Sequence, residues 1–420
     1  MKRLIDDFSG REAAHPAEDS TPLQKSRNFI GLRSMRLVVL AVVAWSSVFA
    51  AWDGHMLLQT VPEKAGGNTT APFSLLISGT FPELATVSSG GHVLNTVSCG
   101  VNSITCPADL VFAKDSQCAV PYSGWDILGY SATTGQLAAM VEIPLLSDIR
   151  PTKVYICAGN PLISTFQGSA RGAAYDNNYL LALHMDETSG TILHDSTANA
   201  NDAVKKSSTA PSPISDAKLV GGQRFVGMRN STNNDYVRFQ SNTAPTSSYT
   251  MEYWSNAASY VNQDTVFLAP HDSGGPVIYT GFYWFPSGTI LFRNSWGAAT
   301  PSASSAASTG TFHNIVFVRD NDTMNVYLDG VAGTVATGFG TGAATWSGLG
   351  WSESPSQAYD SFNGTLDEIF YSKVARGPAY ITARYNNVES PSTFYTVGPF
   401  TPITPTPRST TRANSQVNVF

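Results

Sequence analysis

Short apolar runs separated by turn residues are the feature that most limits what this chain can fold into. Residues 73–79, 109–114, 137–146 and 153–161 are such runs, and Gly and Pro stand between them. The chain contains 35 Gly and 24 Pro, and no long stretch of it shows helical periodicity. Strands bounded by Gly and Pro produce this pattern. The sequence therefore predicts an all-β protein made of sandwiches.

The charge balance excludes one large class of partner. Charged residues make up 13% of the chain, and its formal net charge is −6. Proteins that bind nucleic acid need a basic excess to neutralise phosphates. We therefore expect no nucleic-acid partner, while the 42% of hydrophobic residues is ample for a packed core.

The N-terminal region has the pattern of an export signal. An apolar run at 37–49 follows Arg33 and Arg36 and ends in small residues, which predicts a signal peptide at 35–50. The run is shorter than the roughly 20 residues of a bilayer-spanning helix. Residues 1–34 are a polar leader or a misassigned start. An uncleaved anchor is the alternative; otherwise we expect no transmembrane helix after signal removal and a secreted or cell-surface protein.

The four cysteines agree with export. They all lie between residues 52 and 175, and none belongs to a C-x-x-C pair, so zinc and thioredoxin-type chemistry lack their spacing. An even number in an exported chain favours disulfides, and four cysteines allow three pairings. A local bridge, Cys99–Cys106, would close the short loop between these residues, and Cys118–Cys157 would then join two strands. Four free thiols in a reducing compartment are the alternative.

The region 52–175 predicts a small disulfide-bonded β-sandwich. Its segments 72–77, 109–112, 140–144 and 154–161 are similar to an uncharacterised bacterial surface β-domain that commonly precedes a laminin-G-like domain. No activity is known for that family, so the resemblance implies none here.

The region 176–398 shows a second series of alternating strands. They include 236–239, 249–254, 312–318 and 324–330, and the series closes with Phe-Asn-Gly-Thr-Leu-Asp-Glu-Ile at 362–369. The Asp-Gly pair at 329–330 predicts a tight hairpin. This series resembles the laminin-G-like, concanavalin A-like jelly roll. Alanines 198, 200 and 203 replace glycines of the family's first loop, which puts that loop's conformation in question. The Thr/Pro-rich residues 399–420 predict an extended tail.

The first loop of this second domain is a candidate calcium site. Carboxylate and amide oxygens are the ligands that calcium prefers, and the loop supplies them from Asp195, Asn199, Asn201 and Asp202. The resemblance implies one structural calcium near this loop and the closing strand, with Asp195, Asn199, Asp367 and Glu368 as candidate ligands. A polar turn with local backbone bonds is the alternative.

Catalytic motifs are weak. The segment 271–277 resembles the nucleophile region of chymotrypsin-type proteases, but the separate upstream His segment that activates the serine is missing. We expect a turn there, with Ser273 inert. Glycoside hydrolases need two carboxylates close together. Asp367 and Glu368 are adjacent, so a regular strand would point them to opposite faces. The sequence therefore predicts that the chain is not an enzyme.

Aromatic residues give the candidate ligand site. Tyr283, Trp284 and Trp296 cluster in sequence, and aromatic platforms stack against sugar rings. The alternative is that they fill the sandwich core. We expect an extracellular or cell-surface recognition protein that binds a glycan or an extracellular protein. A polysaccharide-active enzyme on the same fold and a purely structural surface protein are the alternatives, because fold alone does not fix function.

Overall fold

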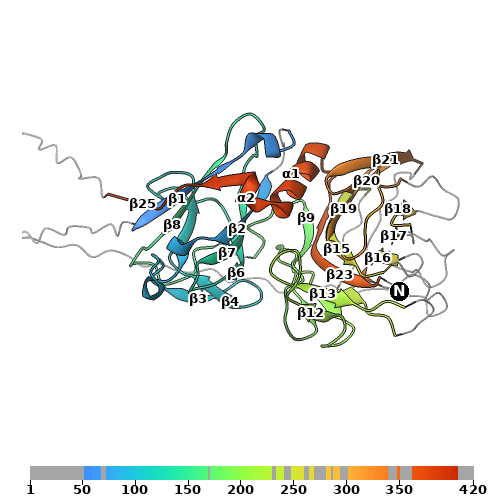
Figure 1. The fold of residues 1–420 in the computed structure, drawn as a ribbon, viewed down its shortest axis with the longest axis horizontal. Helices are drawn as coiled ribbons and strands as arrows, with labels where there is room; N and C mark the ends of the chain where they lie inside the picture. Colours follow the sequence, from blue (N-terminus) through green and yellow to red (C-terminus); the bar gives the residue numbers. More distant parts are fainter. Residues whose placement is uncertain are drawn as a thin grey trace, which may run out of the picture. The chain divides into compact units, whose positions relative to one another are not determined.

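The computed structural model describes residues 52–67, 72–168, 171–228, 233–240, 247–259, 264–268, 281–284, 287–293, 301–338, 348–350 and 362–404. The expected signal peptide, the segment around Ser273, Trp296 and most of the tail lie outside these ranges. Strands dominate the described residues, which confirms the all-β expectation (Figure 1).

The first sandwich has two antiparallel sheets (Figure 1). One runs β24-β1-β8-β5, with β25 also paired to β1, and the other runs β2-β7-β6. Their strands are β1 (Gly54–Thr60), β2 (Phe73–Thr80), β5 (Leu110–Ala113), β6 (Trp125–Tyr130), β7 (Gln136–Ile143), β8 (Lys153–Ala158), β24 (Tyr395–Val397) and β25 (Thr401–Pro402). A hairpin of β3 (Thr96–Cys99) and β4 (Ile104–Pro107) and three 3-10 turns, at Pro62–Lys64, Pro82–Leu84 and Val87–Ser89, complete it. The sequence did not anticipate that residues 395–402 return to this sandwich.

Both expected disulfides are present. Cys99–Cys106 links β3 to β4, with the two Cα atoms 5.8 Å apart. Cys118–Cys157 links the loop after β5 to β8, with the Cα atoms 6.3 Å apart. The first bridge links the two strands of the β3–β4 hairpin close to its turn, and we call residues 96–107 the cystine hairpin.

The second sandwich also consists of two sheets. One runs β12-β13-β23-β15-β19-β20-β21, with β9 paired to β23, and the other runs β10-β11-β14-β22-β16-β17-β18. The strands of the first are β9 (Tyr179–Leu183), β12 (Ser212–Ile214), β13 (Gly222–Phe225), β15 (Ser248–Ala257), β19 (His313–Asp320), β20 (Thr323–Leu328), β21 (Val331–Thr337) and β23 (Gly364–Ser372). Those of the second are β10 (Ile192–Leu193), β11 (Ala203–Lys205), β14 (Val237–Phe239), β16 (Asp264–Leu268), β17 (Gly281–Trp284), β18 (Ile290–Arg293) and β22 (Gly348–Leu349).

The predicted hairpin turn is present between β20 and β21. Asp329 has φ +51° and Gly330 has φ +75°. Positive φ at both central residues is what a two-residue turn of type I′ requires, and the Asp-Gly pair tolerates it best.

An apolar seam joins the two sandwiches. In β2 and β7 the odd-numbered side chains, such as Leu75 and Ala139, enter the core of the first sandwich. The even-numbered ones, Leu76 and Met140 among them, join Trp254 and Phe370 of the second sandwich in a separate buried cluster. These strands are therefore apolar on both faces, as strands buried on both sides must be.

The C-terminal segment seals the edge of β2. Helices α1 (Pro378–Glu389) and α2 (Pro391–Phe394) both contact this strand (Figure 1). The Asn387 side chain accepts a hydrogen bond from the Leu76 N–H (2.7 Å) and donates one to the Leu76 carbonyl (2.9 Å). The Tyr395 hydroxyl does the same at Ser78, with distances of 2.7 and 2.9 Å. Side chains thus satisfy backbone groups that an open sheet edge would leave unpaired.

Replacing Asn387 by Ala should lower the free energy of unfolding by about 2–3 kcal/mol, because two buried backbone groups of Leu76 lose their partners. The neighbouring Asn386→Ala is the matched control: its exposed amide makes one bond, to the Lys64 carbonyl, and its loss should cost less than about 1 kcal/mol. Urea unfolding measures both values. Equal losses in the two variants would contradict this role for Asn387.

Candidate functional site

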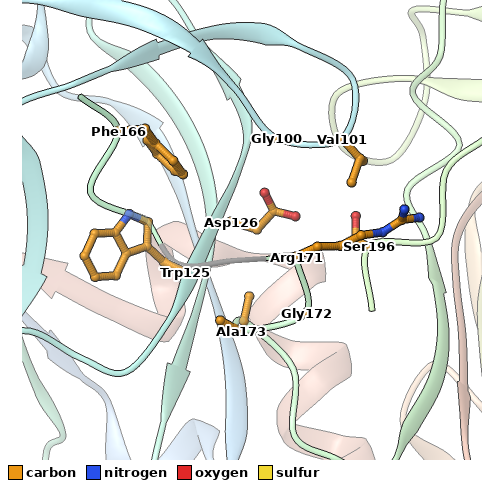
Figure 2. A pocket seen from close by; sticks show the side chains of 10 residues that line it. Gly100, Val101, Trp125, Asp126, Phe166, Arg171, Gly172, Ala173 and Ser196 are labelled. Atoms are coloured by element: carbon orange, nitrogen blue, oxygen red, sulfur yellow. The ribbon is translucent and has the colours of Figure 1, made fainter. Parts of the chain in front are cut away.

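Three voids follow β6 in a row beneath the cystine hairpin. A cavity of about 190 Å³ lies beside Trp125 and Asp126 (Figure 2). A neck of about 10 Å³ follows at Asp126, Ile127 and Leu128. A groove of about 730 Å³ begins at Leu128 and continues along Gly129 and Tyr130. The hairpin borders all three voids, and residues of the second sandwich line the opposite walls.

The cavity combines aromatic and polar groups. Figure 2 shows Trp125 and Phe166 on one side of it, the Asp126 carboxylate in the middle, and Ser196 and Arg171 on the other. Burial raises the pKa of the Asp126 carboxyl, against the opposing effects of the His184 charge and the Ser196 hydroxyl. The Trp125 side chain is 3% exposed, and its indole nitrogen has no hydrogen-bond partner among the described residues.

A buried ion pair lies next to the neck. His184 Nδ1 is 2.8 Å from Glu368 Oε1, and His184 Nε2 is 2.6 Å from the Tyr175 hydroxyl. Burial by itself would lower the pKa of His184, but the charge of Glu368 and the hydrogen bond to it outweigh that effect and raise the pKa to about 9. At neutral pH the imidazole is therefore protonated, and both of its nitrogens donate.

A side-chain contact holds the cystine hairpin against the second sandwich. Asn102 Nδ2 donates to Asp186 Oδ1 over 2.6 Å, and both residues line the neck. Burial raises the pKa of Asp186 to about 6, since the His184 charge offsets it only in part. The contact lies at the neck, whose volume of about 10 Å³ is close to that of one water molecule.

None of the described residues that line the groove is charged. Its polar groups are hydroxyls and amides from Ser78, Ser103, Thr105, Tyr130, Ser131, Gln136 and Ser215. Its apolar surface includes Leu128, Leu219 and Val220. The volume falls in the range of about 300–1,000 Å³ that is typical of ligand sites. Such a groove suits a neutral ligand with both polar and apolar faces.

The expected arrangement of Asp367 and Glu368 is wrong. The register between β15 and β23 shifts at this point, and Glu368 has φ +53°. Both Leu366 and Ile369 enter the core of the second sandwich, although residues three apart on a regular strand face opposite ways. The β-bulge therefore leaves both carboxylates on the other face. They are 0% and 1% exposed, and Asp367 accepts from the Leu219 N–H while Glu368 pairs with His184.

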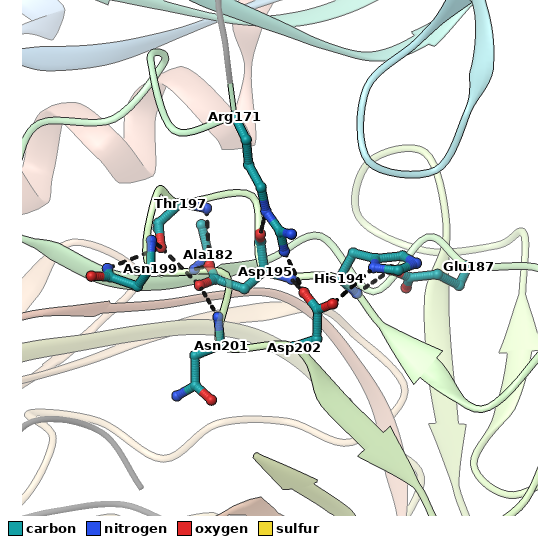
Figure 3. A network of polar contacts seen from close by, with 9 residues as sticks. All are labelled: Arg171, Ala182, Glu187, His194, Asp195, Thr197, Asn199, Asn201 and Asp202. Carbon is teal, nitrogen blue, oxygen red and sulfur yellow. Dashed lines mark hydrogen bonds and ion pairs between the residues drawn. The ribbon is translucent and has the colours of Figure 1, made fainter. Parts of the chain in front are cut away.

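The loop between β10 and β11 is organised by the Asp195 carboxylate (Figure 3). Its Oδ1 accepts from the backbone N–H of Ala182 and of Thr197, each over 2.9 Å. Its Oδ2 accepts from the Thr197 hydroxyl (2.8 Å) and the Asn201 N–H (2.9 Å). Ala200 adopts φ +51° although it stands where the family has glycine. These four bonds hold the loop in a conformation that costs an alanine about 1–2 kcal/mol.

The same contacts do not fit a calcium ion. Four N–H and O–H donors occupy the Asp195 oxygens, and the Asn199 amide donates to the Tyr179 carbonyl and to Thr197. Asp367 and Glu368 each bond through one oxygen to a partner outside this loop, the Leu219 N–H and His184. Among the described residues no group of three or more His, Cys, Asp or Glu side chains is placed to hold a metal. Calcium stays a prediction of the sequence that these contacts do not support.

The aromatic candidates are not tested. Tyr283 and Trp284 lie in β17, but their side chains, and Trp296 altogether, are outside the described residues. Sequence patterns did not indicate Trp125, Asp126, Arg171 or Ser196. These residues come from three separate segments and meet only in the folded chain, so no local motif marks them.

His184 should give stability a distinct dependence on pH. Its folded pKa of about 9 lies above its usual value of 6.5, so the stabilisation is complete below about pH 6.5 and is lost as the pH rises through 9. The free energy of unfolding should fall by about 3 kcal/mol across this window. Chemical unfolding measured from pH 6 to 10 checks this, and His184→Gln should abolish most of the slope. An unchanged slope in that variant would assign the effect to other groups.

Asp195→Ala should lower the free energy of unfolding by about 3–4 kcal/mol, because buried donors lose their acceptor. The loss should be the same in calcium chloride and in chelator. Asp216→Ala, at an exposed loop position, is the control and should change stability by less than about 0.5 kcal/mol. A loss that disappears in chelator would mean that the loop holds calcium after all.

Comparisons with known proteins give only weak likenesses. The chain matches no curated protein. It is similar to domain 4 of an extracellular GH43 arabinanase from Geobacillus stearothermophilus in complex with arabinotriose, at 17% identity and a TM-score of 0.37, over 49% of this chain and 97% of that one. It is also similar to a SAP-like pentraxin from Limulus polyphemus, at 16% identity and a TM-score of 0.32, over 38% and 78%. Likenesses this weak say nothing about the ligand of this chain.

A family model gives the assignment. Residues 231–382 match the model described as the concanavalin A-like lectin/glucanases superfamily. The match covers most strands of the second sandwich, including β15, β19, β20 and β23. The expected identity of the preceding domain stays a prediction. Over residues 231–382 the second sandwich of this chain is therefore similar to the concanavalin A-like lectin/glucanases superfamily.

Proposed function

We propose that this chain is an exported recognition protein that binds carbohydrate in the groove beside β6. The observation that carries the proposal is the lining of that groove, whose described residues are uncharged and combine hydroxyl and amide groups with apolar side chains. Sugars present hydroxyls at their edges and C–H groups on their faces, so they match both kinds of surface. The groove is large enough for several sugar residues.

Binding fits this groove better than catalysis. Hydrolysis of a glycosidic bond uses two carboxylates on either side of the bond, and the described lining of the groove contains no Asp or Glu. Asp126 has a raised pKa, as a general acid would, but it lies beyond the neck, which has no room for a substrate. The Asp367–Glu368 pair is buried away from the groove, and each carboxylate bonds to an internal partner through one oxygen.

Export is part of the proposal. The two disulfides form and persist in oxidising compartments, and the sequence at 35–50 has the pattern of a signal peptide. Within the described ranges, no helix has the length and apolar character to cross a bilayer.

Thr105→Trp should abolish glycan binding on an array, because the indole would fill the groove from its hairpin wall. Thr96→Trp is the matched control: both threonines are exposed on the cystine hairpin, but Thr96 does not line the groove. The wild type and the control should bind the same glycans. Binding by none of the three proteins, or equal binding by all of them, would contradict the proposal. Binding only to extracellular proteins would mean that the ligand is a protein and not a carbohydrate.

A further inference from the structure

We propose that the cavity beside Trp125 is a second binding site, separate from the groove, that takes one neutral, hydroxyl-rich ring. Its ligand is a free monosaccharide or a single sugar residue at the end of a chain. The inference rests on the proposed function only for the class of ligand. Nothing in the groove is needed for it.

An unpartnered donor in the wall of the cavity points to a ligand. The Trp125 indole N–H is buried and bonds to none of the described residues. A buried donor without a partner costs about 1–3 kcal/mol. Native structures rarely leave such groups unsatisfied, so a ligand or an ordered water completes them.

Asp126 adds a hydrogen-bond acceptor to the cavity, so the ligand must also donate. Its carboxylate faces the same space (Figure 2) and accepts hydrogen bonds. A sugar hydroxyl both donates and accepts, so one ring can donate to Asp126 and accept from Trp125. Asp126 disfavours an anion, while the indole donor and the nearby Arg171 disfavour a cation. The ring of Phe166 offers an apolar surface to the C–H face of the ligand.

The size of the cavity limits the ligand to one ring. Its volume of about 190 Å³ is below the roughly 300 Å³ at which sites for larger ligands begin. The neck admits no more than a water molecule, and Asn102 and Asp186 close it. A sugar chain therefore does not continue from this cavity into the groove.

Calorimetric titration of the full chain with a panel of neutral monosaccharides, and with oligosaccharides that end in the same residues, tests the inference. At least one monosaccharide should bind saturably. Trp125→Phe removes the N–H but keeps an aromatic ring and should weaken binding about tenfold or more, as loss of a bond to a buried donor does. Asp126→Asn, which preserves the side-chain volume, should weaken it to a similar extent.

Trp254→Phe is the matched control. Trp254 is also buried with an unpartnered indole nitrogen, but it packs in the seam and lines none of the three voids. It should leave monosaccharide affinity within twofold of the wild type. If Trp125→Phe does not fold, Asp126→Asn decides the question.

The inference is overturned if no monosaccharide binds, which would mean that the cavity holds water only. It is also overturned if Trp125→Phe and Asp126→Asn both bind as the wild type does. The same holds if Trp254→Phe weakens binding as much as these two variants do. Oligosaccharide binding that Thr105→Trp removes and the cavity variants leave intact would overturn this inference and keep the proposed function. Monosaccharide binding that only the cavity variants weaken would keep this inference and overturn the proposed function.

Discussion

The closure of the β2 edge by side chains from the C-terminal segment is the interaction on which the rest of the structure depends. The backbone groups of Ser74, Leu76 and Ser78 point away from β7, and Arg384, Asn387 and Tyr395 bond to them in that order. Arg384 also reaches Glu252 on β15, 3.4 Å away. One short segment therefore ties the edge of the first sandwich to the outer face of the second. The seam holds the walls of cavity and groove together.

The buried charged groups in the seam add little net stability, but they fix how the two sandwiches pack. Paired charges that leave water pay a desolvation penalty, so they contribute little net stability, but removing one partner is strongly destabilising. The pair of His184 and Glu368 lies next to the neck, and the bulge at Glu368 is what turns this carboxylate toward the seam. We infer that these charges fix how the two sandwiches meet, and hence the shape of the space beneath the cystine hairpin.

The features that the sequence predicted correctly are those that depend on residues close together in the chain. Alternating apolar runs predicted the strands, the Asp-Gly pair predicted the β20–β21 turn, and a short intervening loop predicted the Cys99–Cys106 bridge. The sequence missed what depends on distant residues. Asn387 and Leu76 are 311 positions apart, and the bulge that overturned the expected orientation of Asp367 and Glu368 arises from pairing with β15. The cavity around Trp125 joins segments that no local pattern connects.

Hydrogen exchange of the β2 backbone amides tests most directly whether this edge is closed. The N–H groups of Leu76 and Ser78 donate only to side chains, those of Asn387 and Tyr395. If the C-terminal segment is an integral part of the fold, these amides exchange only with global unfolding, as slowly as the central amides of β15. Exchange of Leu76 and Ser78 at the rate of an open sheet edge, with β15 still protected, would contradict the account.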